Sequence, residues 1–122
     1  MSQERQELAR EEWRPFFEMV TKDFQGARVS VEVLSGEYGD QVEAEGLSLA
    51  YIEYDDRAGV FSVAVGGGDT GEPIEVRHMV PHPRTIYASP NIADIPWTFD
   101  VVAEDGTQSI ITVQLRTALG GD

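Results

Sequence analysis

The sequence predicts an α+β domain, in which an N-terminal amphipathic helix packs against a curved, mostly antiparallel sheet or open barrel of about six to seven strands. Apolar residues follow a helical period over residues 9–24, and after Gly26 they alternate with polar residues through most of the chain. Because 41% of the 122 residues are hydrophobic, we expect one domain over residues 1–122, with frayed ends at 1–8 and 118–122.

The helix is predicted from the spacing of its apolar side chains. The residues that recur at i, i+3, i+4, i+7 and i+11 are Trp13, Phe16, Phe17, Val20 and Phe24. Such a stripe with four aromatics could form a stacking platform or line a cofactor site, but it is more typical of the face that a helix packs on a core, and we interpret it so. Gly26 is expected to end the helix in a left-handed conformation, and Pro15 to lie close to its first regular turn.

Strands are predicted where apolar and polar residues alternate. The predicted segments are 29–34, 42–45, 47–54, 60–65, 74–80, 85–88, 97–102 and 111–115. Gly46 is a plausible bulge, at which the second strand continues or a new one begins. Hairpins are indicated at Ser35–Asp40, Asp55–Gly59 and Asp105–Gly106, the last with a type I′ turn. Since one face of such a sheet must be covered, we expect the sheet to wrap around the helix.

The charge balance limits the partners. The chain has 22 acidic and 9 basic residues, of which only Lys22 is lysine, and its net charge is −13. Nucleic acids and anionic membranes are bound through positive surface, so both are excluded, whereas a protein partner is compatible. The dispersed acids fit either a high-salt cytoplasm or a GC-rich genome combined with ordinary solubility. A strand such as Val29–Val33 could be an edge that pairs with a second copy, so the oligomeric state stays open.

Cysteine usage and the N-terminus limit chemistry and location. The absence of cysteine excludes disulfides, thiolate nucleophiles and Cys-based metal sites. Residues 1–14 are charged and contain no apolar stretch, and no apolar run approaches the length of a membrane span. We therefore expect a cytoplasmic protein.

Two histidines and one acidic pair are the candidate site residues. His78 and His82 have the i, i+4 spacing of metal ligands on a helix, but Pro81 rules out a helix there. We expect His78 to be a core or strand-end histidine and His82 an exposed loop residue. Asp55 and Asp56 could form a calcium site or a hydrolase dyad, but adjacent aspartates before a glycine are more typical of a turn. No catalytic, cofactor or metal site is therefore assigned.

Other motifs of catalysis are incomplete. The run Gly66–Gly68 lacks the Lys and Ser/Thr that follow in a phosphate-binding loop. Ser62, Ser89 and Ser109 lack the context of a nucleophile elbow, and with two histidines in the chain a hydrolytic triad is not expected.

Several segments together resemble a family of small bacterial proteins that is classed as a domain of unknown function. The matching elements are Trp13-x-x-Phe16-Phe17, Val31–Leu34, Gln41–Leu49, Tyr54-Asp55, the His78 to Pro83 spacing and the Asp105-Gly106 hairpin. The resemblance spans nearly the whole chain and implies a shared fold, but it implies no activity, cofactor or site residue.

Three hypotheses about function follow. The first is a non-enzymatic accessory protein that presents an acidic sheet surface and loops to a protein partner. The second is an open barrel that binds a small apolar or cationic ligand in a cavity lined by Trp97, Tyr51 or Tyr87. The third is a hydrolase or metal enzyme, which requires at least three side chains from His78, His82 and the Asp55-Asp56 loop to converge.

Overall fold

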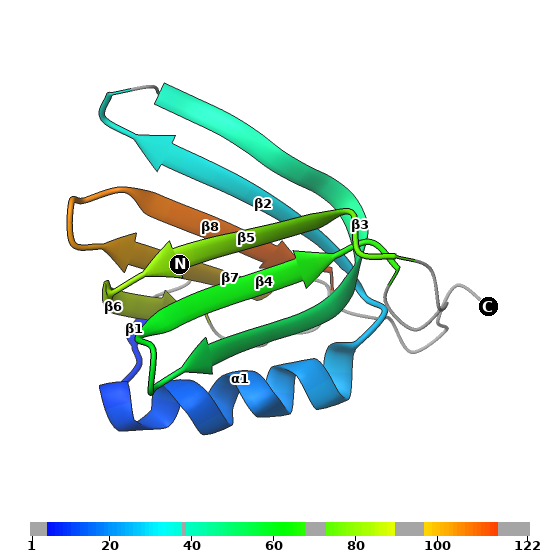
Figure 1. Ribbon diagram of the computed structural model, residues 1–122, viewed down its shortest axis with the longest axis horizontal. Helices are drawn as coiled ribbons and strands as arrows, with labels where there is room; N and C mark the ends of the chain where they lie inside the picture. The colour runs from blue at the N-terminus through cyan, green and yellow to red at the C-terminus, as the bar shows by residue number, and fades with distance from the viewer. Residues whose placement is uncertain (1–4, 38, 68–72, 90–96, 115–122) are drawn as a thin grey trace.

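A computed structural model describes residues 5–37, 39–67, 73–89 and 97–114 (Figure 1). Helix α1 spans Arg10–Phe24. The strands are β1 (Gln6–Glu7), β2 (Arg28–Ser35), β3 (Gly39–Asp55), β4 (Val60–Val65), β5 (Val76–Pro81), β6 (Pro83–Ala88), β7 (Trp97–Ala103) and β8 (Gln108–Val113). The predicted fold, one helix on a mostly antiparallel sheet, is confirmed in outline, but the described strands number eight rather than about six to seven.

The strands form one curled, open sheet in the order β1-β6-β7-β8-β2-β3-β4-β5, with antiparallel neighbours throughout. Strand β3 makes the corner, because its first half pairs with β2 and its second half with β4 over 17 continuous residues. The register shifts near Gly46, which has a φ of 66°, so the predicted bulge is confirmed and β3 continues through it. Figure 1 shows β4 and β5 folded over in front of β7 and β8 as a result.

Helix α1 packs its aromatic stripe into the curl of the sheet. Trp13 and Phe17 are buried, and the Phe17 ring meets Phe61 of β4 and Phe99 of β7 edge-on, with ring centroids 5.2 and 5.4 Å apart. The core-face interpretation is therefore confirmed. The helix begins at Arg10 and continues through Pro15, so the proline lies inside the helix, close to its first turn.

The segment before α1 is bound to the sheet over residues 5–8, where we had expected a frayed end; residues 1–4 of that expectation lie outside the described part of the chain. Arg5 forms an ion pair with the buried Asp100 on β7, and its guanidinium carbon lies 4.3 Å from the centroid of the Tyr87 ring. The Leu8 N–H donates to the Ile86 carbonyl over 2.8 Å. This segment includes β1, which was missed because two residues are too few to show alternation. Residues 118–122 lie outside the described part of the chain.

Two further expectations need correction. The Asp105-Gly106 hairpin is present, but only Gly106 has a positive φ, 92°, and its N–H donates to the Ala103 carbonyl over 3.0 Å. This is a three-residue loop that ends in a left-handed glycine, and not a type I′ turn. Strand β2, which contains Val29–Val33, lies between β3 and β8, so it is not an edge. The ends of the described sheet are β1 and β5.

Candidate functional site

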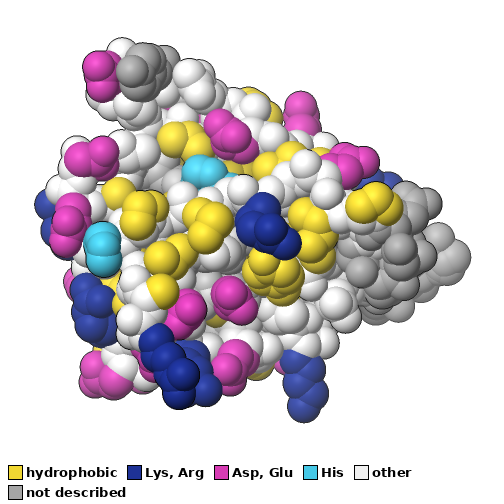
Figure 2. Space-filling model, viewed as in Figure 1, with side chains coloured by type: hydrophobic (Ala, Val, Ile, Leu, Met, Phe, Trp, Pro, Cys, Tyr) yellow, Lys and Arg dark blue, Asp and Glu magenta, His cyan; other side chains and the backbone are white. Residues whose placement is uncertain are grey.

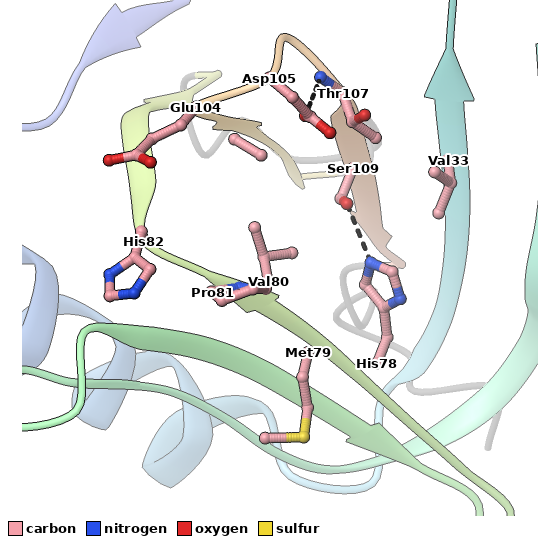
Figure 3. A pocket seen from close by; sticks show the side chains of 11 residues that line it. Val33, His78, Met79, Val80, Pro81, His82, Glu104, Asp105, Thr107 and Ser109 are labelled. Carbon is pink, nitrogen blue, oxygen red and sulfur yellow. Dashed lines mark hydrogen bonds between the residues drawn. The ribbon is translucent and has the colours of Figure 1, made fainter. Parts of the chain in front are cut away.

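A groove of about 370 Å³ lies between β5 and the β7–β8 hairpin (Figure 3). We call it the edge groove. Its lining residues are Val33, His78, Met79, Val80, Pro81, His82, Ala103, Glu104, Asp105, Thr107 and Ser109. They come from β2, from β5 and the corner after it, and from the β7–β8 hairpin, so the curl of the sheet creates the groove.

One wall of the edge groove is the unpaired edge of β5. The His82 N–H donates to the Gly59 carbonyl over 2.7 Å, and His78 lies opposite Val63 in the same register. Because bonded and non-bonded pairs alternate in an antiparallel ladder, the N–H and C=O groups of Arg77 and Met79 point away from β4. In the part of the chain that the structure describes, no strand pairs with that edge.

At the base of the groove, His78 and Ser109 join β5 to β8. The His78 Nε2 atom lies 2.9 Å from the Ser109 hydroxyl oxygen, and Figure 3 shows the two side chains facing each other across the gap. His78 is half-buried, and this burial lowers the pKa of its imidazole below the ordinary value of 6.5, an effect that the nearby Glu43 carboxylate partly opposes. We expected a core or strand-end histidine, and the half-buried position of His78 on β5 agrees with this expectation.

Ser109 was not singled out by sequence reasoning as a partner of His78. The available signal was its position, since Ser109 shares its strand face with Ile111 and Val113, both fully buried. A hydroxyl at an inward position of a strand needs a hydrogen-bonding partner. The sequence could not show which residue that partner is, because β5 and β8 are far apart in the chain.

The hairpin rim of the groove carries negative charge. Asp105 is exposed, and its carboxylate accepts a hydrogen bond from the Thr107 N–H over 3.0 Å, which holds its pKa below the usual range. Glu104 precedes it on the same turn and is also exposed. Asp105 is therefore ionised at neutral pH, at the opening of the groove.

The outer face of β5 is partly apolar. Met79 is 54% exposed, and Figure 3 shows its side chain pointing away from Ser109. On the same outer face, the Arg77 Nε donates to the Tyr51 hydroxyl over 2.8 Å. Figure 2 shows hydrophobic side chains gathered over β4 and β5, with charged side chains around them. The edge thus has an apolar outer flank as well as an inner groove.

Of the other candidate residues, His82 lies at the end of the groove, and Asp55 and Asp56 lie beyond it. His82, with a φ of 51°, is exposed at the corner between β5 and β6, beside the Asp55–Gly59 loop. The Asp55 carboxylate accepts hydrogen bonds from the backbone N–H groups of Arg57 and Ala58 over 3.0 and 3.3 Å, as expected for a turn former.

Asp56 faces a different neighbour, since its carboxylate lies 4.0 Å from the Arg14 guanidinium on α1. His78 lies four residues before His82 along an extended strand, on the order of 13 Å away. Within the described residues, no three His, Asp or Glu side chains gather as ligands for a metal ion. The convergence that the metal-enzyme hypothesis requires is not formed by these side chains.

The three aromatic residues of the ligand-cavity hypothesis are not brought together. Trp97 belongs to the buried core, where its ring centroid lies 5.0 Å from that of Phe99. Tyr51 lies under Arg77, and Tyr87 lies under Arg5 at the other end of the sheet. A shared site between helix and sheet is therefore not built from these rings.

Across the described residues, α1 is too short and too charged to cross a lipid bilayer, and no other helix is present that would do so.

Comparison with known proteins identifies relatives by sequence. The model of a family described as a family of unknown function (DUF5335) matches residues 4–121. A protein of Aquifex aeolicus (strain VF5), described as an uncharacterized protein, is 30% identical over 107 residues, which cover 88% of this chain and 89% of the relative. No solved structure matches the chain. The resemblance to a family of unknown function is therefore confirmed.

Proposed function

We propose that the chain, which belongs to the family of unknown function DUF5335, is a cytoplasmic, non-enzymatic accessory domain. In this proposal it binds an extended segment of another protein along the free edge of β5. The observation that carries this proposal is the unpaired edge beside the edge groove. An added strand would bond to the N–H and C=O groups of Arg77 and Met79, and its alternate side chains would enter the groove.

Natural sheets usually protect a long exposed edge, because it invites pairing with other chains. Here the protection is partial. The backbone of Pro81, like that of Arg77 and Met79, faces away from β4. Because proline has no N–H, this end of the edge offers no hydrogen-bond donor. The remaining edge is short and flanked by an exposed methionine and a groove, which suits a short and specific added strand.

A hydrolase is the second candidate, because the 2.9 Å contact joins a serine hydroxyl to a histidine. Two observations favour protein binding over it. Ser109 is only 2% exposed, and Glu43 influences His78 through its charge and not through a hydrogen bond to the ring. A fluorophosphonate probe should label wild type no more than Ser109→Ala; labelling that depends on Ser109 would favour the hydrolase.

The test of protein binding uses a library of displayed random peptides, selected against the whole protein. Selected peptides should bind wild type and perturb the backbone amide NMR signals of β5. The variant Met79→Pro should bind the peptides about tenfold or more weakly, because proline removes the N–H donor at the free edge. The hydrogen bonds to β4 should remain, since the Met79 N–H does not take part in them.

The matched control is Met79→Ala, which removes the side chain and keeps the backbone N–H. It should retain most of the affinity, and circular dichroism should show that both variants fold. Equal binding by wild type and Met79→Pro, or NMR changes confined to other strands, would overturn the proposal.

A further inference from the structure

The charged side chains on the hairpin rim of the edge groove are both acidic. Glu104 and Asp105 lie there on adjacent positions of one turn, and both are exposed. The Glu43 carboxylate lies near His78 at the groove base, close enough for its charge to act on the imidazole. In the described residues these carboxylates have no ion-pair partner, since the ion pairs there involve Arg5 and Arg14.

The basic residues of β5 and the corner after it form no ion pair with this rim in the described part of the chain. Arg77 belongs to β5 but is held on the outer face, where its Nε bonds to the Tyr51 hydroxyl. His78 faces Ser109, and burial lowers its pKa, which disfavours the charged ring. His82 is exposed at the corner, at the end of the groove. The rim carboxylates therefore keep their negative charge at the groove opening, within a chain of net charge −13.

Strand geometry determines where an added segment would place its side chains. Successive side chains of a strand point to opposite faces, so every second residue of an added strand would continue the inner face of His78 and Val80. Those side chains would lie in the groove, between β5 and the rim with Glu104 and Asp105. The other side chains would lie beside Met79 on the apolar outer face.

We infer that the segment bound along β5 is basic, with Lys or Arg at alternate positions that face the groove and uncharged residues between them. This inference rests on the proposed function and specifies the chemistry of its partner. Charge complementarity distinguishes such a segment from a second copy of this chain, because two molecules of charge −13 repel each other in dilute buffer.

The test uses three synthetic peptides, each with the six-residue length of β5. The first alternates Lys and Thr, the second alternates Glu and Thr, and the third alternates Lys and Pro. The first combines basic charge with strand-forming ability, and the second keeps the strand and reverses the charge. The third keeps the charge but lacks the backbone N–H at every second position, where the side chain would face away from the groove. Binding is measured by amide NMR titration of the full chain in dilute buffer and in about 0.5 M KCl.

The Lys–Thr peptide should bind at β5 at least about tenfold more tightly than either of the others, and its affinity should fall with salt. The double variant Glu104→Gln/Asp105→Asn should weaken this binding several-fold, while the amide oxygen introduced at position 105 can still accept the hydrogen bond from Thr107. The matched control, Glu12→Gln/Asp23→Asn, removes the same charge from α1, which contributes no residue to the groove lining, and should leave the affinity nearly unchanged.

The outcomes separate this inference from the proposed function. If the Glu–Thr peptide, or display-selected peptides without Lys and Arg, bind β5 as well as the Lys–Thr peptide, the basic partner is wrong and strand binding stands. Equal binding by the Lys–Pro peptide shows general charge attraction and overturns the inference. If neither synthetic nor selected peptides perturb β5, both proposals fail. A concentration-dependent dimer that pairs through β5 would identify a second copy as the occupant.

Discussion

His78 is a residue whose charge state depends on the fold. In the folded protein its ring is half-buried against Ser109, with the Glu43 carboxylate as the charged neighbour that acts on it. Burial lowers its pKa below 6.5, so the unfolded chain takes up a proton at a higher pH than the folded chain does. The stabilising contribution of the neutral ring is complete above pH 6.5 and is lost as the pH falls from 6.5 through the lower folded-state pKa.

The first prediction concerns this pH window. The melting temperature of wild type should rise between about pH 5 and pH 7, and by about 1–3 °C more than that of His78→Gln, which can hydrogen-bond to Ser109 but does not titrate. His82→Gln is the matched control, because His82 is exposed, and it should keep the wild-type slope. Differential scanning calorimetry across the pH range measures all three proteins; identical slopes for wild type and His78→Gln would contradict the assignment.

Among the elements, α1 is the one on which the curl of the sheet depends, because its aromatic side chains meet rings from β4 and β7 at once. Removing one of them leaves a cavity that the surrounding strands cannot easily close. The cost of such a change combines lost burial with the cavity that remains.

The second prediction compares two substitutions on α1. Phe17→Ala should lower the free energy of unfolding by about 3–5 kcal/mol, since Phe17 is fully buried. Met19→Ala should cost less than about 1 kcal/mol, because Met19 is 38% exposed. Urea denaturation with an unchanged m-value measures both. A cost for Phe17→Ala as small as that for Met19→Ala would show that the helix does not depend on this contact.

Local pattern predicted the elements better than it predicted their neighbours. The 3.6-residue period predicted α1, and alternation predicted β2, the first half of β3, β5, β7 and β8. The hairpin chemistry of the Asp55–Gly59 turn, which follows from its residue types, indicated β4 after it. The sheet order was not readable, because the pairing of β2 with β8 joins segments about eighty residues apart, and no local period encodes such pairing. Consequently β2 was taken as an edge, and the free edge at β5 was not predicted.

The same limit applies to the candidate site. The inward face of His78 follows from alternation along its own strand, and so does the exposed position of His82 next to two prolines. The edge groove depends on the curl that brings β5 toward β8, which is a property of the whole sheet. Its rim residue Asp105 was recognised only as part of a turn. The local sequence shows that an aspartate can accept hydrogen bonds within a turn, but it does not show which distant strand the turn lies beside.

For the molecule as a whole, dispersed like charge is the main electrostatic feature. One local sign of it is the pair Glu32 and Asp40 on β2 and β3, where a hydrogen bond from one carboxyl group to the other, together with the charge of Asp40, raises the pKa of Glu32. Carboxylates whose charges act on each other in this way are crowded. Mobile cations screen such repulsion, and they do so more strongly as the ionic strength rises.

The third prediction is therefore a salt dependence of stability. The melting temperature should rise by several degrees between dilute buffer and molar KCl, because screening relieves repulsion within a chain of charge −13. Glu32→Gln should melt at a higher temperature than wild type in dilute buffer and should gain less from salt. A melting temperature that does not change with KCl would remove the support for adaptation to a salty cytoplasm.

The two ends of the described sheet differ in length, and this limits how copies of the chain could assemble. The β1 end offers two residues, whereas the β5 end offers six. Growth of a fibre by strand addition needs two usable edges on every copy, and here one of them is nearly absent. Association through β5 would accordingly stop at a closed pair, and a partner segment bound there would compete with that pair for the same backbone groups. In the described sheet, the short β1 end and the net charge of −13 therefore both oppose the growth of a fibre by strand addition.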